Sequence, residues 1–455
     1  MRAGTISARG PRRRVVRRRP RRSKALYYLL FATLFLLVIL SNMVLTRFGI
    51  RYDLEGGTPL EKIHPAHFLA IGTLFLLWFS HTRPMDYIDT LFTRHKGTLV
   101  FLVTWVLLLF QITVIQHKPF TPIIDTFIFP VILLFLLGSV SERQRFKLGR
   151  LMHFLMLANA LLGLFEFLTG FRLTPMDVGG FIIEGDWRSS AFLGHPLTNA
   201  LITGGYLITL ALGGWRDLPW IMKPALFGIN LLAMNAFGGR MALVSMLIFL
   251  VIIFSFKMIG TLNGGALARK NWLLGVLLVP FGIGALVVGF EIGLFDQFVG
   301  RFIDDKGSAS ARVIMFEVFR DLSLLDIMIG PDPEHVASLL RAHGLNFGIE
   351  SFWVAFILSY GFIVSMIFFV GLFAFLYDVI KASSRAAIWP IVYFMTVSST
   401  SVSLSAKGTD LAFVVVLSVL LLQKPKKPVV RRRARSRLIA GEKQSLMGHN
   451  SARAS

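Results

Sequence analysis

Four arginines in the middle of this chain are the residues best suited to do chemistry. Arg188, Arg240, Arg301 and Arg312 lie far from the two terminal segments that carry most of the positive charge, so their presence needs a separate reason. A guanidinium group stays charged at any accessible pH, and its planar fork binds two phosphate oxygens at once. A cluster of such groups at a bilayer surface suits a lipid-linked phosphate or diphosphate. Any one of them can instead pair with a nearby carboxylate or extend to the lipid–water interface.

Three residues further along the chain are candidates for accepting a proton from a hydroxyl. They are His335, His343 and Glu350, because a histidine or a carboxylate is the usual general base. Each can equally have a purely structural role: His335 lies in an expected turn, His343 precedes a glycine in a loop, and Glu350 can pair with an arginine. His195 directly precedes a proline, which favours the first helical turn, so it is better understood as the residue before a helix.

Acidic residues precede the first arginine. Asp177, Glu184 and Asp186 can pair with Arg188 or contact sugar hydroxyls, and the sequence leaves both roles open. The pair Asp304-Asp305 is too common in loops to predict a metal site. The chain has no cysteine, which excludes disulfides and thiolate metal sites. We therefore expect neither a metal ion nor another cofactor.

The composition identifies the elements that must carry these residues. The chain has 455 residues, of which 55% are hydrophobic, and a mean hydropathy of +0.66, which is too apolar for a soluble globule. Apolar runs of about 20 residues, the length that spans a bilayer, recur along it. They lack the alternation of barrel strands, and only helices or closed barrels satisfy the backbone in hydrocarbon. The sequence predicts an all-α polytopic membrane protein with about twelve transmembrane helices.

The expected spans divide the chain into a membrane domain, residues 25–423, and two basic tails, residues 1–24 and 424–455. The spans are residues 26–46, 66–80, 97–115, 122–139, 151–169, 196–213, 219–237, 241–256, 272–290, 351–377, 387–405 and 409–422.

The basic residues predict the orientation of these spans. Both tails are dense in arginine and lysine, so both ends are expected in the cytoplasm, and the short loops that then fall inside also carry basic residues. The net charge of +23 comes largely from these tails. We expect them to anchor the topology and to attract anionic membrane lipids, and not to bind nucleic acid, because no aromatic-interleaved module accompanies them.

Two long segments, residues 170–195 and 291–350, are expected outside. Within the second, residues 310–325 and 334–342 have apolar residues at near-helical spacing, so it is expected to be partly helical and to form a lid over a cavity on the membrane surface. The cytoplasmic loops are too short for a nucleotide-binding domain, and the chain has neither a P-loop nor a dinucleotide fingerprint. ATP hydrolysis and nucleotide-sugar chemistry on the inner face are therefore not expected.

The sequence around the first two arginines resembles a known family. Residues 188–196, Arg-Ser-Ser-Ala-Phe-Leu-Gly-His-Pro, are similar to the Arg-x-Ser-Gly-x-Phe-x-x-Pro signature of the O-antigen ligase and polymerase superfamily. Residues 239–243, Gly-Arg-Met-Ala-Leu, resemble its Ser-Arg-Gly-Ala-Leu segment.

Three later segments continue the resemblance in the same order. Ser310-Ala311-Arg312 followed by Phe316 resembles the arginine element of the family's large periplasmic loop. Residues 329–331 are similar to its Gly-x-Gly turn, and residues 351–362, with Tyr-Gly, resemble the helix that follows. The resemblance covers about residues 151–375, and order, spacing and sidedness agree.

The chain also departs from the family pattern. Ala191 stands where the family has glycine, and Glu350-Ser351 occupies the approximate place of a His-Asn pair. The nearest histidines are His335 and His343, which leaves the family's catalytic histidine unassigned. These departures favour an exopolysaccharide polymerase-like member over a lipopolysaccharide ligase.

The resemblance implies an activity and its partners. The donor would be a glycan on undecaprenyl diphosphate at the periplasmic face of the bacterial inner membrane, and an acceptor glycan would displace the lipid diphosphate at the anomeric carbon without a metal ion. Arg188 and Arg240 would bind the diphosphate, followed by Arg312, while Arg301, His195 and Asp186 are substrate-binding candidates. Polysaccharide-assembly membrane proteins are expected partners.

A transporter or flippase for lipid-linked glycans or other solutes is the alternative. Ion-coupled carriers place carboxylates, lysines or broken helices near the midplane and show internal repeats. Here Asp125, Glu166 and Asp410 lie towards the ends of spans, and no convincing repeat is visible. A noncatalytic assembly or regulatory membrane protein is the third hypothesis.

Overall fold

The computed structural model describes residues 24–54, 56–174, 177–178, 181–182, 187–214, 218–263, 291, 300, 308–345 and 348–424. The chain divides into two units, residues 1–422 and 423–455, and every helix described below belongs to the first. Several predicted features lie outside the described residues: Glu184, Asp186, Arg301, Asp304, Asp305, the expected span 272–290 and almost all of the two tails. For Asp177 only the backbone is described.

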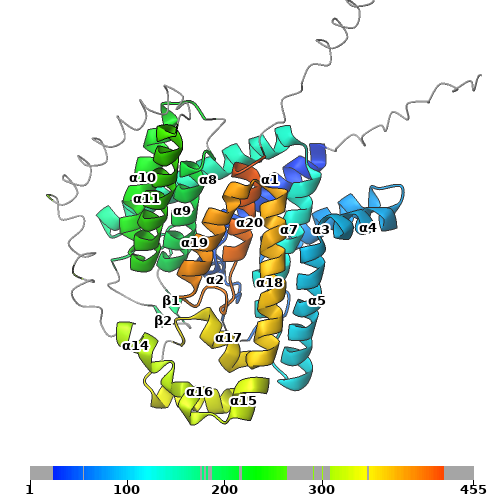
Figure 1. Ribbon diagram of the computed structural model, residues 1–455, viewed down its shortest axis with the longest axis vertical. Helices are drawn as coiled ribbons and strands as arrows, with labels where there is room; N and C mark the ends of the chain where they lie inside the picture. The colour runs from blue at the N-terminus through cyan, green and yellow to red at the C-terminus, as the bar shows by residue number, and fades with distance from the viewer. Residues whose placement is uncertain are drawn as a thin grey trace, which may run out of the picture. The chain divides into compact units, whose positions relative to one another are not determined.

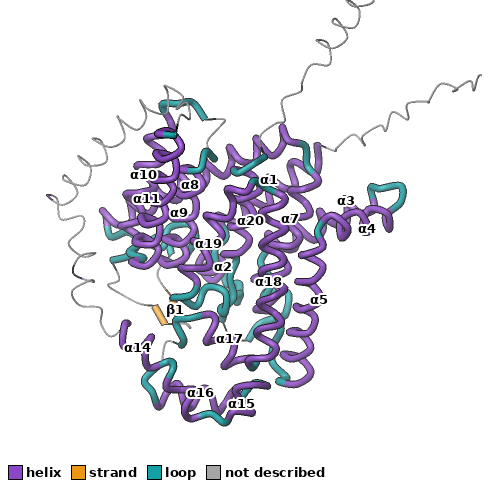
Figure 2. Tube along the Cα trace, in the orientation of Figure 1, coloured by secondary structure: helices purple, strands orange, loops and turns teal. Residues whose placement is uncertain are grey.

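The described chain is helical apart from one small hairpin, in which β1 (Asp177–Val178) pairs antiparallel with β2 (Phe181–Ile182) (Figures 1 and 2). The α-helices are α1 Lys24–Ile39, α2 Asn42–Arg47, α3 Pro65–Phe79, α4 Pro84–Arg94, α5 Lys96–Phe110, α6 Thr121–Ile123, α7 Phe129–Ser139, α8 Glu142–Thr169, α9 Pro196–Ala211, α10 Met222–Phe237, α11 Arg240–Leu262, α14 Ser308–Ile314, α15 Leu324–Ile329, α16 Pro333–Ala342, α17 Phe352–Tyr360, α18 Phe362–Ala382, α19 Ile388–Ser398 and α20 Asp410–Leu421. The shorter elements are the π-helices η1 Gln111–Ile115 and η2 Ile124–Ile128 and the 3₁₀-helices η3 Glu317–Asp321 and η4 Arg385–Ala387.

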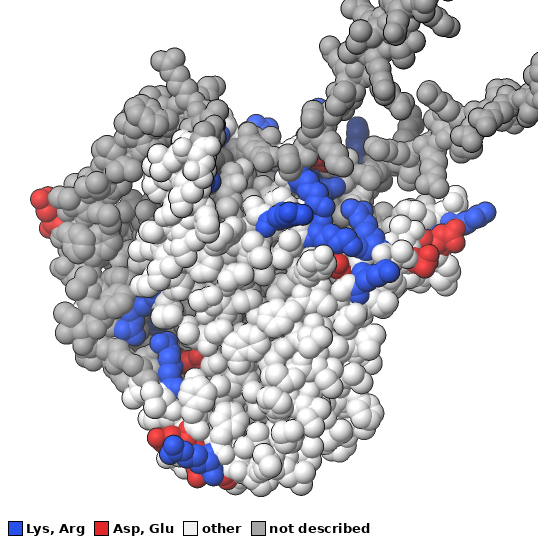
Figure 3. All heavy atoms as spheres, viewed as in Figure 1, with Lys and Arg blue, Asp and Glu red and all other residues white. Residues whose placement is uncertain are grey.

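The helices indicate a membrane protein. Within the described residues, five helical segments are long and apolar enough to cross a bilayer: Lys96–Ile115, Thr121–Ser139, Glu142–Thr169, Arg240–Leu262 and Phe362–Ala382. Three shorter apolar helices, Lys24–Ile39, Pro65–Phe79 and Asp410–Leu421, accompany them. On the face drawn in Figure 3, a broad area carries neither basic nor acidic side chains, and the charged groups lie towards its edges. An uncharged surface of this kind is what contact with hydrocarbon requires.

The core is built around α20. All of its residues are buried, and it packs against α7, α8, α9 and α18. A second long contact runs between α5 and α18, which lie side by side in Figures 1 and 2. Close approach at this contact uses Gly371, where a Cβ would lie 2.0 Å from the Oγ1 of Thr104. Small residues allow such approach where helices pack inside a membrane.

Two expected helices are interrupted. The span predicted at 26–46 ends at Ile39, and Ser41 then caps α2 by accepting a hydrogen bond from the N–H of Val44 at 3.5 Å. The span predicted at 351–377 breaks at Gly361, whose φ is 81°, and continues as α18 to Ala382. A Cβ on Gly361 would lie 2.4 Å from the backbone nitrogen of Gly330, so this break accommodates the turn after α15. Both interruptions depend on distant contacts, which the apolar pattern does not report.

The outer segment, which we define as residues 308–350, is partly helical as predicted. Its expected helix 310–325 is wrong in detail, because α14 ends at Ile314 and a 3₁₀ turn follows, whereas α16 agrees with the expected helix 334–342. The segment has a small core of its own, shared with α17: Met315, Val318, Leu322, Leu345, Ile349, Val354 and Leu358. The short loop expected between the spans 66–80 and 97–115 also contains a helix, α4, which has no buried residue.

Candidate functional site

The loop that carries Arg188 is braced by hydrogen bonds to buried polar groups. We define the Arg188 loop as residues 187–195, which precede α9. The N–H of Ser189 donates to the carbonyl of Ala236 at the end of α10, at 2.9 Å. The hydroxyl of Ser190 donates to the carbonyl of Thr174, at 2.8 Å. The loop is thereby tied both to α10 and to the segment that follows α8.

Glu166, in the last turn of α8, holds the centre of this loop. Its carboxylate is fully buried, and Oε2 accepts hydrogen bonds from Ser189 Oγ at 2.6 Å, Ser190 N at 3.0 Å and Ala191 N at 2.9 Å. Oε1 accepts from Leu173 N at 3.0 Å. A buried carboxylate is tolerated when several donors satisfy it, and such charge-assisted bonds are strong. Glu166 therefore fixes the backbone on the C-terminal side of Arg188.

The backbone of Ala191 shows how tightly the loop is held. Its φ is +39°, in the left-handed region that glycine adopts readily and other residues rarely do. A strained conformation of this kind persists only where the surrounding contacts over-determine it. The bond from Ala191 N–H to Glu166 is one of those contacts.

Two buried asparagines brace the loop from the neighbouring helices. Asn159 on α8 accepts from the N–H of Phe192 at 3.0 Å and donates to the amide oxygen of Asn199 on α9 at 2.9 Å. Asn199 in turn donates to the carbonyls of Ser190 at 2.6 Å and His195 at 3.1 Å. The side chain of Asn159 thus gives the N–H of Phe192 a partner, and Asn199 adds a second hydrogen bond to two carbonyls that also accept from backbone N–H groups.

Arg188 lies against the turn that leads into α11. Gly238, with φ of 63°, ends α10, and a Cβ placed there would lie 2.8 Å from Arg188 Cγ and 2.8 Å from Trp187 Cη2. Arg240 follows two residues later as the first residue of α11, a helix of 23 residues. Both arginine side chains are half-buried. The fold thus brings Arg188 to the chain segment that carries Arg240, beside a helix N-terminus whose dipole also attracts anions.

Arg312 is engaged differently. Its Nη2 lies 3.1 Å from Oε2 of Glu350, and the two side chains are 33% and 41% exposed. This is the ion pair that the sequence left open for both residues. The structure therefore joins Arg312 to a carboxylate of the outer segment.

The remaining candidates are distributed over helix ends. His195 caps α9, with its Nδ1 accepting from Leu197 N at 3.2 Å, which confirms it as the residue before a helix. His335 is exposed and lies within the first helical turn of α16. The expectation that it lies in a turn between elements was therefore wrong. His343 Nε2 lies 2.7 Å from Oδ2 of Asp321, an arrangement that orients the imidazole.

The sequence interpretation missed Glu166, Asn159 and Asn199 as parts of the site. A usable signal existed, because polar side chains within apolar spans are costly and therefore tend to have specific partners. That signal identifies the residues but not their partners. Asn159 and Asn199 are 40 positions apart, and their contact depends on how α8 packs beside α9.

A groove among the described residues lies away from this loop. It has a volume of about 370 Å³ between α18 and α19, and its lining is mainly apolar, with Tyr377, Thr396 and Ser399 as the polar members. It contains no residue of the Arg188 loop. Chemistry on a charged group needs fixed charges and hydrogen-bond donors, and the Arg188 loop offers more of these than the mainly apolar groove.

No protein-family model matches this chain, and a search of curated proteins finds no match either. The geometry defines the class as an α-helical membrane protein with an arginine-bearing loop, fixed by a buried carboxylate, at the ends of α8 to α11.

Proposed function

We propose that this protein is a glycosyltransferase of the polysaccharide polymerase or O-antigen ligase type. It transfers glycan units from undecaprenyl diphosphate to an acceptor sugar at the periplasmic face of the bacterial inner membrane, in exopolysaccharide or O-antigen biosynthesis. The observation that carries the proposal is the packing of Arg188 on Gly238, two residues before Arg240 in the chain. Two guanidinium groups from separate elements would there meet one diphosphate.

The chemistry explains why these groups would need to be held firmly. As the acceptor hydroxyl attacks the anomeric carbon, the bond to the lipid diphosphate breaks and negative charge grows on the leaving group. Cationic groups already in position stabilise that charge without having to reorganise, and removing one such contact typically costs about 10²- to 10³-fold in rate. The bonds from Glu166 to the residues beside Arg188 supply this preorganisation.

Two backbone features support the family resemblance. Ala191 stands where the family has glycine, and its φ of +39° is a conformation that glycine favours. The turn after α15 has φ of 106° at Gly330 and packs on Gly361 at the break between α17 and α18. The resemblance expects a glycine at the first of these places and a Gly-x-Gly turn at the second.

The proposal includes about twelve transmembrane helices and two cytoplasmic termini. Helix α8 supports this orientation. Arg143, Arg145 and Lys147 lie in its first two turns, whereas Glu166 binds the Arg188 loop in its last turn. The preference of basic residues for the cytoplasmic side would place the start of α8 inside and the Arg188 loop outside.

Substitution of the two arginines tests the proposal. We expect Arg240→Ala to lower transfer from a synthetic lipid-diphosphate-linked glycan at least about 100-fold while insertion and stability stay unchanged. Arg188→Lys keeps the charge and loses the fork, so a clear loss there would show that bidentate binding matters. Arg94→Ala, at an exposed arginine in the last turn of α4, is the matched control and should transfer normally. Full-length polymer made by Arg240→Ala at comparable expression would defeat the proposal.

A further inference from the structure

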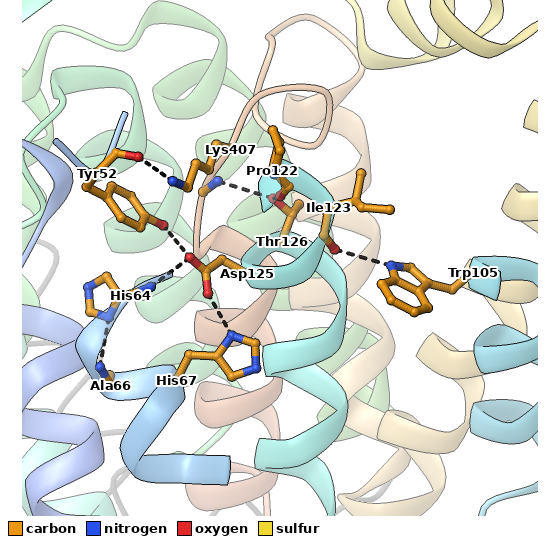
Figure 4. A network of polar contacts seen from close by, with 11 residues as sticks. Tyr52, His64, Ala66, His67, Trp105, Pro122, Ile123, Asp125, Thr126 and Lys407 are labelled. Carbon is orange, nitrogen blue, oxygen red and sulfur yellow. Dashed lines mark hydrogen bonds and ion pairs between the residues drawn. The ribbon is translucent and has the colours of Figure 1, made fainter. Parts of the chain in front are cut away.

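A second buried carboxylate, Asp125, lies at the centre of a polar network (Figure 4). It belongs to the π-helical turn η2 and is fully buried. Its Oδ2 accepts from the hydroxyl of Tyr52 at 2.9 Å and from the N–H of His64 at 2.8 Å. Its Oδ1 lies 2.6 Å from Nδ1 of His67. Single π-helical turns inside apolar helices are frequent at functional sites.

The same network reaches the loop between α19 and α20. Lys407 donates to the carbonyl of Tyr52, and its ammonium lies 3.6 Å from the centroid of the Tyr52 ring. Thr126, next to Asp125, donates to the carbonyl of Ala406 at 3.3 Å and accepts from the N–H of Gly408 at 3.2 Å. Asp125 and its neighbour therefore connect the loop after α2, the start of α3 and the loop before α20.

The charges within the network explain why the carboxylate is tolerated. Burial lowers the pKa of His64, which keeps this ring uncharged. Burial also lowers the pKa of Lys407 to about 8, while the nearby Asp125 and Asp53 oppose that shift. Lys407 is half-buried and remains mainly charged at neutral pH, so it offsets part of the charge of Asp125.

One branch of the network leads towards the Arg188 loop. Nε2 of His64 hydrogen-bonds to the carbonyl of Leu40, at the break between α1 and α2. The next residue, Ser41, packs on the loop: a Cβ on Gly194, where φ is +79°, would lie 2.5 Å from Ser41 Oγ. Contacts therefore run without interruption from Asp125 through His64, Leu40 and Ser41 to Gly194.

We propose that Asp125 is a positioning residue for Arg188, acting through His64 and Leu40 on the α1–α2 break against which the Arg188 loop packs. Glu166 holds the loop directly after Arg188, and this second contact holds it near its far end, at Gly194. That this positioning serves catalysis rests on the proposed function. The coupling between Asp125 and the Arg188 loop does not depend on that function.

A fluorine label on Trp187, directly beside Arg188, measures this coupling. The full-length protein is labelled with 5-fluorotryptophan in lipid nanodiscs, and the Trp187 resonance is assigned by its loss in Trp187→Phe. Asp125→Asn retains the shape of the side chain but removes its negative charge and replaces one acceptor oxygen with an NH₂ donor. The contact with Nδ1 of His67 then survives only if that nitrogen accepts, and the bonds from Tyr52 and His64 lose their charge assistance. We expect this variant to shift or broaden the Trp187 resonance.

Asp378→Asn is the matched control. Asp378 is also buried, and it accepts from the N–H of Thr98 at 2.7 Å and from its hydroxyl at 3.0 Å, at the start of α5. This variant loses a comparable buried carboxylate without touching the route to Gly194, so the Trp187 resonance should stay unchanged. An unchanged resonance in folded Asp125→Asn, or an equal change in Asp378→Asn, would overturn the proposal.

Gly194→Ala tests the last contact of the route. It should alter the Trp187 resonance as Asp125→Asn does, because the added methyl group pushes against Ser41. The double variant should add little, because both changes disturb the same contact. If Asp125→Asn fails to fold, His64→Leu removes the ring contact to Leu40 and retains the N–H bond to Asp125. An unchanged resonance in folded His64→Leu would equally overturn the route.

The glycan-transfer assay separates this proposal from the proposed function. If both hold, Asp125→Asn lowers the transfer rate about 10- to 100-fold, the cost expected for a misplaced binding group, while Asp378→Asn transfers normally. If wild-type protein transfers no glycan but the fluorine result holds, the coupling is real and the proposed function is wrong.

Discussion

The Arg188 loop and the outer segment both carry an arginine that the sequence singles out, but they hold it in different ways. Around Arg188 the polar partners are buried: Glu166 is fully buried, and Asn159 and Asn199 are as well. In the outer segment, Arg312 and Glu350 are about one-third or more exposed, and His343 and Asp321 are 24% and 48% exposed. The two arginines are themselves both half-buried, so the difference lies in their surroundings: buried groups hold the loop of Arg188, and a partly exposed carboxylate pairs with Arg312.

This difference has an energetic consequence. A hydrogen bond to a charged group contributes about 1.5–3 kcal/mol when it is protected from water, whereas an exposed ion pair contributes about 0–1 kcal/mol. The Arg188 loop is therefore suited to hold a preorganised binding group. The outer segment, with its small core and partly exposed ion pairs, is held less firmly.

Loss of the Glu166 carboxylate should lower the free energy of unfolding more than any other change proposed for these two regions. In Glu166→Gln an NH₂ group replaces one carboxylate oxygen, and even at the place of Oε1 it faces the N–H of Leu173, so that bond is lost. The three bonds to the remaining oxygen lose their charge assistance. We expect a loss of about 3 kcal/mol or more in the free energy of unfolding, measured in detergent. Glu350→Gln is the control and should cost less than about 1 kcal/mol. Equal losses in the two variants would show that the two regions do not differ.

Ala191→Gly should change stability in the unusual direction. Most truncations of buried side chains destabilise, but at a φ of +39° glycine relieves strain that alanine bears. We expect a gain of up to about 1 kcal/mol, partly offset by the greater freedom of glycine in the unfolded chain. Thermal unfolding of the variant beside wild type measures this. A marked loss of stability would mean that the methyl group contributes more than the strain costs.

The Arg312–Glu350 pair should show a small coupling energy. A double-mutant cycle with Arg312→Ala and Glu350→Ala is expected to give about 0.2–1 kcal/mol, and less at high salt, because the pair is partly exposed. The same cycle followed by transfer activity separates an ion pair from a substrate-binding arginine. A coupling of several kcal/mol would mean that this pair is as strong as the buried contacts around Glu166, which would contradict the difference between the two regions.

Lys407 is half-buried, and its titration should appear in the pH dependence of the free energy of unfolding. Its pKa is lowered from the ordinary 10.5 to about 8, mainly by burial. Between these two values the unfolded chain binds more protons than the folded chain, so this group makes stability rise as pH increases from about 8 to 10.5, with no contribution to the slope below that range. Comparison of wild type with Lys407→Met over this range isolates the effect. A falling difference curve would contradict the sign.

Much of the helical framework could be predicted from the sequence. Residues 66–80, 97–115, 122–139 and 196–213 were expected as helices and agree with observed ones to within a few residues. The breaks at Leu40–Ser41 and Gly361 were not expected, because each depends on a distant partner. Among the site residues, Arg188 and Arg240 were predicted, but Glu166 was noted only for its position near a helix end.

The sequence by itself determined that this chain is helical and apolar enough for a membrane, because apolar runs report directly on the surroundings that a helix can tolerate. It also determined which side chains can bind an anion. Only the tertiary structure decided which arginine is held by buried groups. Glu166 and Ser189 are 23 positions apart, and Asn159 and Asn199 are 40 apart, so these partners meet through helix packing and not through any local pattern.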